Sequence, residues 1–101
     1  MPATVHPPKD AAYTAARSNA FYSDLLAQVG APPTAQNLAV LRAWQHVEQG
    51  DTTTALWNPL DSERSSGLPG ETLYNQAGVK NYPSRVGGLS TEAATLMNYP
   101  A

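Results

Sequence analysis

The middle of this 101-residue chain, residues 51 to 70, is dense in turn-forming residues. It contains an Asn-Pro pair, a Ser-Ser-Gly run and a Leu-Pro-Gly run, all of which favour turns over helices or strands. This stretch is therefore predicted to be a long irregular loop. Loops of this length in a compact domain are usually functional or disordered, and Trp57 and Leu60 give this one apolar side chains with which to dock.

Two helices are predicted before the loop. In the first, over residues 19–29, apolar side chains recur at helical spacing, and Gly30 followed by two prolines supplies a stop. The second is predicted from Ala35 to about Glu48, with Thr34 as its N-cap. Its apolar side chains share one face: Leu38, Leu41, Trp44 and Val47.

A short hairpin and a third helix are predicted after the loop. Residues 72–74 and 79–82 are strand formers, separated by a connection longer than a tight two-residue turn. Ser84 can cap a helix ending near Asn98, in which the Gly87-Gly88 pair permits close approach of a neighbouring segment. The predicted class is therefore mainly α (α+β), with helices packed beside a long loop and a short β-hairpin. Apolar residues at helical spacing in the third helix are Val86, Leu89, Ala93, Leu96 and Met97.

The first 18 residues contain three prolines and an alanine-rich stretch, with almost no large apolar side chain. Such a segment cannot bury much surface, so residues 1–18 are interpreted as a flexible N-terminal arm or linker, with a nascent helix from Asp10 to Arg17. The alternative is that Tyr13 anchors this arm to the domain. Residues 19–101 are expected to form one small domain, because a chain of this length has room for one core.

Composition narrows the classes of function. The formal net charge of -2 lacks the basic excess that neutralises a phosphate backbone, so nucleic acid is not an expected partner. With no cysteine and only His6 and His46, no metal site or cofactor is expected. No apolar run approaches the ~20 residues of a membrane span, and no signal peptide is expected. The chain reads as a soluble protein without membrane contact.

Four runs of sequence carry a resemblance to a known superfamily: LLAQVGAP (25–32), NLAVLRAWQHVE (37–48), WNPL (57–60) and YNQAGVKNYPS (74–84). Together they resemble the lysozyme-like, wall-degrading domains carried by bacteriophages. The resemblance covers most of the chain and leaves the N-terminal arm outside it. It implies cleavage of peptidoglycan glycan strands, as a muramidase, lytic transglycosylase or glucosaminidase, in phage lysis or cell-wall penetration. The protein would then stay in the host cytoplasm until lysis, or travel with the virion.

The resemblance also implies a single catalytic acid. In such folds a Glu at the end of a long helix faces a groove lined by a small hairpin, and Glu48 falls at that place. A general acid must hold its proton near neutral pH, so partial desolvation of Glu48 is expected, and the negative end of the helix dipole would also disfavour its ionisation. The alternative is a solvated helix-end carboxylate.

A second carboxylate has several candidates. Asp51 is the first choice because it is nearest to Glu48 in sequence, although a simple helix-stop role is an alternative for it. The others are Asp61, Glu63 and Glu71. A mechanism with one acid, in which the sugar's own hydroxyl or its acetamido group attacks, is at least as well supported as a pair of carboxyls.

Four residues are predicted to bind the saccharide through amide groups and aromatic faces: Asn58, Tyr74, Asn75 and Tyr82. The alternatives are hairpin packing for the two tyrosines and turn initiation for Asn58. Trp44 lies on the Glu48 side of its helix and is assigned to the core, with groove lining as the alternative.

Two other functions stay open. One is a non-catalytic virion structural or cell-wall-binding module that retains the fold, with the N-terminal arm joining it to other phage protein domains or virion subunits. The other is a helical protein-interaction domain, which would expose an apolar patch around Trp57 and Leu60 and would have no groove beside Glu48.

Overall fold

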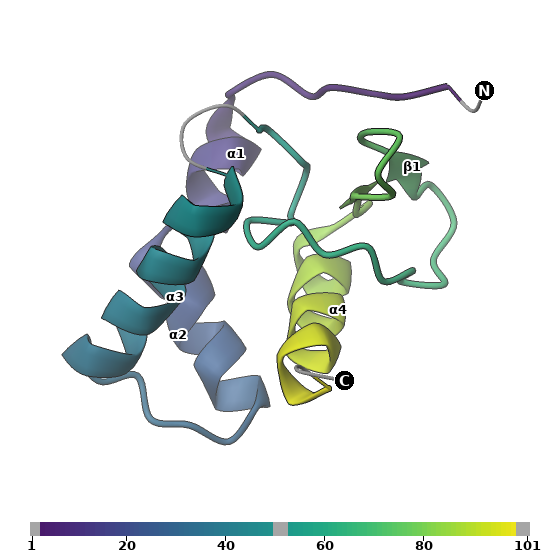
Figure 1. Ribbon diagram of the computed structural model, residues 1–101. Helices are drawn as coiled ribbons and strands as arrows, with labels where there is room; N and C mark the ends of the chain where they lie inside the picture. Colours follow the sequence, from purple (N-terminus) through teal and green to yellow (C-terminus); the bar gives the residue numbers. More distant parts are fainter. Residues whose placement is uncertain (1–2, 50–52, 99–101) are drawn as a thin grey trace.

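The computed structural model describes residues 3–49 and 53–98. These residues form a mainly helical fold with one small hairpin, as predicted (Figure 1). The elements follow the predicted order, and a short helix is formed within residues 10–17, where the sequence predicts a nascent one. They are α1 (Ala11–Ala16), α2 (Asn19–Gln28), α3 (Ala35–Gln49), β1 (Thr72–Leu73), β2 (Lys80–Asn81) and α4 (Arg85–Met97).

α3 and α4 begin at the caps that the sequence predicts, Thr34 and Ser84, and α2 begins at a further cap, Ser18. Ser18 and Ser84 accept hydrogen bonds from the backbone at the starts of α2 and α4, and Thr34 Oγ1 accepts one from Asn37 N at 3.1 Å at the start of α3. At the end of α2, Gly30 adopts a positive φ of 80°, which explains the stop. The described part of the loop, residues 53–70, contains turns but no regular element, as predicted.

The core forms where α2 packs against both α3 and α4 (Figure 1). Its buried side chains come from all three helices and from Leu60 in the loop, while Trp44 and Trp57 pack against its edge. Because the chain has no cysteine, apolar burial and hydrogen bonding must hold this core together. The buried members are Phe21, Tyr22, Leu25, Leu26, Leu41, Leu60, Leu89 and Ala93.

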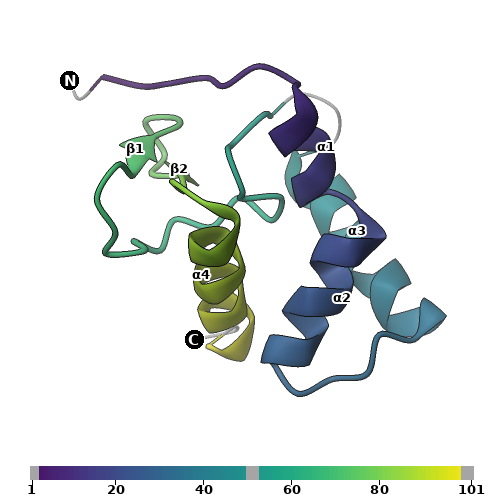
Figure 2. The ribbon, with the colours of Figure 1, turned by 180° about the vertical axis from the view of Figure 1, so that it is seen from behind.

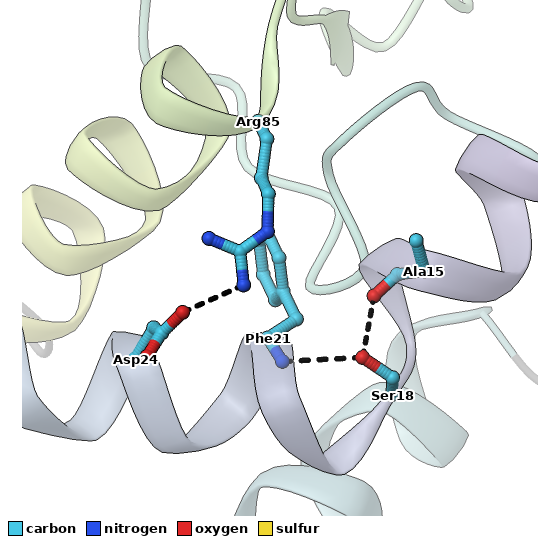
Figure 3. Close-up of polar contacts among 5 residues, drawn as sticks. All are labelled: Ala15, Ser18, Phe21, Asp24 and Arg85. Carbon is cyan, nitrogen blue, oxygen red and sulfur yellow. Dashed lines mark hydrogen bonds and ion pairs between the residues drawn. The ribbon is translucent and has the colours of Figure 1, made fainter.

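A polar contact on the surface joins α2 to α4 (Figure 3). The guanidinium of Arg85 pairs with Asp24 at 2.6 Å and lies 5.8 Å from the centre of the Phe21 ring. Beside it, Ser18 Oγ accepts from Phe21 N and donates to the Ala15 carbonyl, which links the end of α1 to the start of α2. Both ion-pair partners are largely exposed, so the pair itself contributes less than about 1 kcal/mol.

The N-terminal segment runs past the hairpin and then enters α1 (Figure 2). Val5 N donates to Leu73 O at 2.8 Å, and the Asn81 side chain donates to Val5 O at 2.8 Å. At the other end of the segment, Ala16 and Arg17 are buried. Residues 5, 16 and 17, which the sequence assigns to an arm, thus contact the remainder of the described chain.

The Gly87-Gly88 pair permits a close approach, as predicted. A Cβ atom at Gly88 would lie 2.4 Å from the Trp57 carbonyl oxygen and 2.6 Å from its Cβ. Trp57 itself has a positive φ of 51°, a conformation that non-glycine residues rarely adopt. The first turn of α4 therefore sets the path of the loop.

No described helix combines the length and the apolar character that crossing a membrane would demand.

Candidate functional site

Glu48 lies near the C-terminal end of α3, beside two adjoining surface hollows. The first, of about 330 Å³, is largely apolar and is lined by Ala43, Trp44, Val47 and Glu48. The second, of about 230 Å³, has a larger polar share in its lining than the first and is called the polar hollow below; Trp44 and Glu48 line it too. Because these two residues are one helical turn apart, they present an aromatic ring and a carboxyl group to both hollows.

The far wall of the polar hollow comes from the long loop and from α4. Its lining residues beyond α3 are Leu60, Asp61, Ser62, Glu63 and Thr95. The sequence predicts that the hairpin lines the groove, but none of the lining residues belongs to it. The hairpin instead supports the loop from behind, where Lys80 N donates to Ser62 O and Tyr82 N donates to Leu56 O.

The exposure of Glu48 differs from the expected desolvation. Its side chain is exposed in the free domain, and Val47 before it is 81 % exposed. The apolar neighbour Val47 therefore does not shield the Glu48 carboxyl.

Asn58 holds the loop in shape. Its side-chain amide donates to Ser62 O and Lys80 O, both at 2.8 Å, and its oxygen accepts from Ser62 N at 2.8 Å. The residue is completely buried. Asn58 therefore lies outside both hollows, and its side chain serves a turn, the structural alternative to saccharide binding.

The other three predicted saccharide-binding residues also make structural contacts. Tyr74 is 7 % exposed and its hydroxyl accepts from Thr54 N, while Tyr82 is fully buried and its hydroxyl donates to Arg64 O. The Asn75 side chain accepts from Val79 N within the hairpin turn. The structure brings none of these side chains to Glu48.

The candidates for a second carboxylate are separated by the fold. Asp61 and Glu63 line the polar hollow together with Glu48. Glu71 does not, because its carboxylate accepts hydrogen bonds from Ser65 and Ser66 at the far end of the loop. Asp51, the first choice from sequence, lies outside the described residues.

Asp61 has an unusual backbone. Its φ of 55° lies in the left-handed region, which Asp tolerates better than most residues because its short side chain can hydrogen-bond locally. Its side chain is half-buried, and Thr53 Oγ1 donates to it at 3.4 Å. Of the two carboxylates that line the polar hollow with Glu48, Asp61 is thus the one that packing constrains, whereas Glu63 is exposed.

Sequence reasoning missed Glu92, which is completely buried in α4. Burial raises the pKa of its carboxyl well above the ordinary 4.5, and the charge of nearby Asp61 adds to this effect. The Leu60 amide and Arg17 favour the charged form but do not offset burial. Neither oxygen makes a hydrogen bond of normal geometry with the described residues. The sequence signal that could have identified Glu92 as buried is its spacing, since it lies three residues after Leu89 and four before Leu96.

The hollows offer no metal centre. Within residues 3–49 and 53–98, no three or more His, Cys, Asp or Glu side chains are grouped so that they could hold a metal ion. Both hollows are lined by Glu48, which bears a carboxyl group, and by Trp44, and the polar one is also lined by Asp61 and Glu63.

The expected features of a simple protein-interaction domain are not found. Leu60 is 3 % exposed, Trp57 packs against the core, and a hollow lies beside Glu48. The predicted apolar patch around these two residues is therefore wrong.

Comparisons of the chain with models of protein families, with curated proteins and with solved structures found no match.

Proposed function

We propose that this chain is a lysozyme-like domain that cleaves the glycan strands of bacterial peptidoglycan, with Glu48 as the proton donor. The observation that carries the proposal is the position of Glu48. It lines two linked hollows together with Trp44, and Asp61 and Glu63 also line the polar one. Aromatic faces and carboxylates are the groups that bind and cleave sugars.

The two hollows suit a chain of N-acetylated sugars. Hexosamine rings have apolar faces and acetyl methyl groups, which fit the Ala43, Trp44 and Val47 surface. Their hydroxyl and amide groups fit the polar hollow, where Ser62, Thr95 and carboxylates lie. A sugar chain passing across α3 would place a glycosidic oxygen beside Glu48.

Substrate supplies the desolvation that the free domain lacks. A sugar seated in both hollows covers the exposed Glu48 carboxyl and removes water from it. Desolvation raises the pKa of a carboxyl, so the proton is retained until the glycosidic oxygen accepts it. Glu48 therefore becomes an effective proton donor only when substrate is bound.

The reaction that follows uses Asp61. Glu48 gives its proton to the glycosidic oxygen, the bond from that oxygen to the anomeric carbon breaks, and positive charge develops on the sugar ring. Asp61 stabilises that charge and accepts a proton from the attacking water, whose oxygen bonds to the anomeric carbon. If the sugar's own hydroxyl attacks instead, Asp61 accepts that proton and an anhydro sugar forms.

The rival function, a wall-binding module without activity, is favoured by one observation. The open hollows and the exposed Glu48 provide a surface for contact with glycan even without turnover. Both functions predict binding to peptidoglycan, so binding does not separate them.

The experiment is a digest of purified, peptide-stripped glycan strands. The proposal predicts soluble fragments whose masses correspond to the addition of one water per cut, or to anhydro ends if the sugar attacks itself. Protein that sediments with the strands and releases no fragment would establish the binding module. Protein that neither sediments nor cleaves would contradict both functions.

A further inference from the structure

Glu92 lies directly beneath the proposed site. It is on α4, three residues before Thr95, whose side chain lines the polar hollow. The loop residues that pack over it are Leu60 and Asp61, and both line the same hollow. Glu92 is fully buried, and neither of its oxygens makes a hydrogen bond of normal geometry with the described residues, although the Leu60 amide lies near enough to favour the charged form.

The charged and titratable groups that face Glu92 come from every element packed around it. Arg17 comes from the end of α1, Tyr22 from α2, Asp61 from the loop and Tyr82 from the segment before α4. Burial raises the pKa of both tyrosine hydroxyls, so they stay neutral. Arg17 is the cation of this group and Asp61 its second carboxyl.

Arg17 is itself fixed. Its guanidinium donates to the Tyr13 carbonyl at 3.0 Å and lies 3.8 Å from the centre of the Tyr13 ring, and the residue is 9 % exposed. A guanidinium fixed in one position stabilises the charge of one nearby carboxylate well but of two only poorly. The second carboxylate would be buried in a medium of low polarity without hydrogen bonds. Of the two carboxyls, Asp61 reaches the hollow and Glu92 does not.

We propose that Glu92 is a positioning residue of this site. An uncharged Glu92 lets residues 60–62 pack against α4 and does not compete with Asp61 for interaction with Arg17. The inference rests on the proposed function for its use, since Asp61 is the carboxylate that accepts the proton in the proposed reaction. Ionisation of Glu92 would repel Asp61 and compete for Arg17. Residues 60–62 would then separate from α4, and the polar hollow would lose its wall.

The first test is stability against pH, measured by thermal unfolding of the native chain, Glu92→Gln and Glu63→Gln. Gln has the shape of Glu92 and cannot ionise. Because the pKa of Glu92 is raised in the folded state, its carboxyl lowers the free energy of unfolding wherever the unfolded chain can ionise it. This loss of stability is absent below the unfolded-state pKa of 4.5 and grows as pH rises above that value. Glu92→Gln should therefore unfold at a higher temperature than the native chain near neutral pH, and the gap should close below pH 4.5.

Glu63→Gln is the matched control, because it makes the same change in formal charge at an exposed position in the same hollow. It should show no gap that grows with pH. If Glu92→Gln instead unfolds at a lower temperature near neutral pH, Glu92 is the anionic partner of Arg17 and the proposal is overturned.

The second test reads the two carboxyls directly by carbon-13 NMR of the substrate-free protein. At neutral pH the Glu92 carboxyl should be protonated while the Asp61 carboxyl is ionised, and Glu92→Gln should leave the Asp61 signal in place. A Glu92 carboxyl that is ionised at neutral pH would overturn the proposal. Neither measurement requires activity, so both separate this inference from a failure of the proposed function.

The third test joins the two proposals. On glycan strands, Glu92→Gln should keep activity near neutral pH, because the amide, like the uncharged carboxyl, lets residues 60–62 pack against α4. A Glu92→Ala variant, which leaves a cavity under residues 60–62, should lose activity at every pH. A Glu92→Gln protein as inactive as Glu92→Ala near neutral pH would show that the site needs the charged carboxyl, and would overturn the proposal.

Discussion

The Oγ atom of Ser62 lies 2.7 Å from Oγ1 of Thr95, so a single hydroxyl pair joins the long loop to α4 at the edge of the polar hollow. Both residues line that hollow. Thr95 Oγ1 also donates to Thr91 O, and Arg64 N donates to Ser62 Oγ. The position of Asp61 in the same hollow therefore depends on this contact as well as on packing.

Thr95→Val should weaken the site by removing the hydroxyl while keeping the shape of the side chain. The expected loss of stability is about 1 kcal/mol, because Ser62 and the half-buried loop lose one hydrogen bond. Chemical denaturation measures it, and Thr95→Ser, which keeps the hydroxyl, is the control. Equal stability of Thr95→Val and Thr95→Ser would show that the pair does not hold the loop.

Gly88→Ala should destabilise the fold by about 1–3 kcal/mol, because its Cβ would meet the rigid Trp57 backbone at 2.4 Å. The matched variant is Gly87→Ala in the same helix. Its Cβ would meet Leu68 Cδ1 at 2.7 Å, and Leu68 is 43 % exposed and can move. Gly87→Ala should therefore cost much less in thermal unfolding. A larger loss for Gly87→Ala would mean that the Trp57 contact is not the constraint.

Asn58→Asp should destabilise the protein by several kcal/mol at neutral pH, about the cost of an unsatisfied buried charge. An ionised carboxylate cannot donate to Ser62 O and Lys80 O, the two carbonyls that the amide now satisfies. The loss should shrink as pH falls and the new carboxyl protonates. Denaturation at neutral and acidic pH measures this, and a loss that does not depend on pH would contradict the assigned hydrogen bonds.

Glu71 should show the opposite pH dependence to Glu92. Partial burial acts to raise its pKa, but hydrogen bonds from the Ser66 amide and from the Ser66 and Ser65 hydroxyls, with the charge of Lys80, bring the pKa below the ordinary 4.5. A lowered folded pKa contributes stability that is present above 4.5 and is lost as pH falls through the folded value.

Glu71→Gln should therefore be less stable than the native chain near neutral pH, and the two should converge in acid. Thermal unfolding across this pH range measures the difference. A difference that persists unchanged into acid would show that the side chain's shape, and not its charge, holds residues 65 and 66.

The helices could be predicted because their signals are local. Apolar spacing and the caps Ser18, Thr34 and Ser84 act within one or two turns, so the sequence contains all that determines where α2, α3 and α4 begin and end. The Gly87-Gly88 pair was likewise readable as a close approach, although its partner Trp57 lies about thirty positions away in the chain and could not be named.

The walls of the site could not be predicted because they depend on the path of the loop. Asn58 and Tyr82 look like sugar-binding groups in sequence, yet a buried amide and a buried phenol are what an irregular loop needs to satisfy its own backbone. Apolar spacing also failed to identify the core-facing side of α4 at its two ends, since Val86 and Met97 are exposed. Glu92 is among the buried positions between Leu89 and Leu96, beside Thr91 and Ala93.

The central claim is that Glu48 donates the proton, and the most direct measurement is the rate of fragment release from purified glycan strands by the native chain and by Glu48→Gln. The amide keeps the shape of the side chain but has no acidic proton, so we expect the rate to fall by about 10²–10⁴-fold, the usual contribution of a general acid. The control is His46→Gln, because His46 is exposed on the same helix and lines neither hollow. This variant should keep the native rate. A Glu48→Gln protein that releases fragments at the native rate would contradict the account.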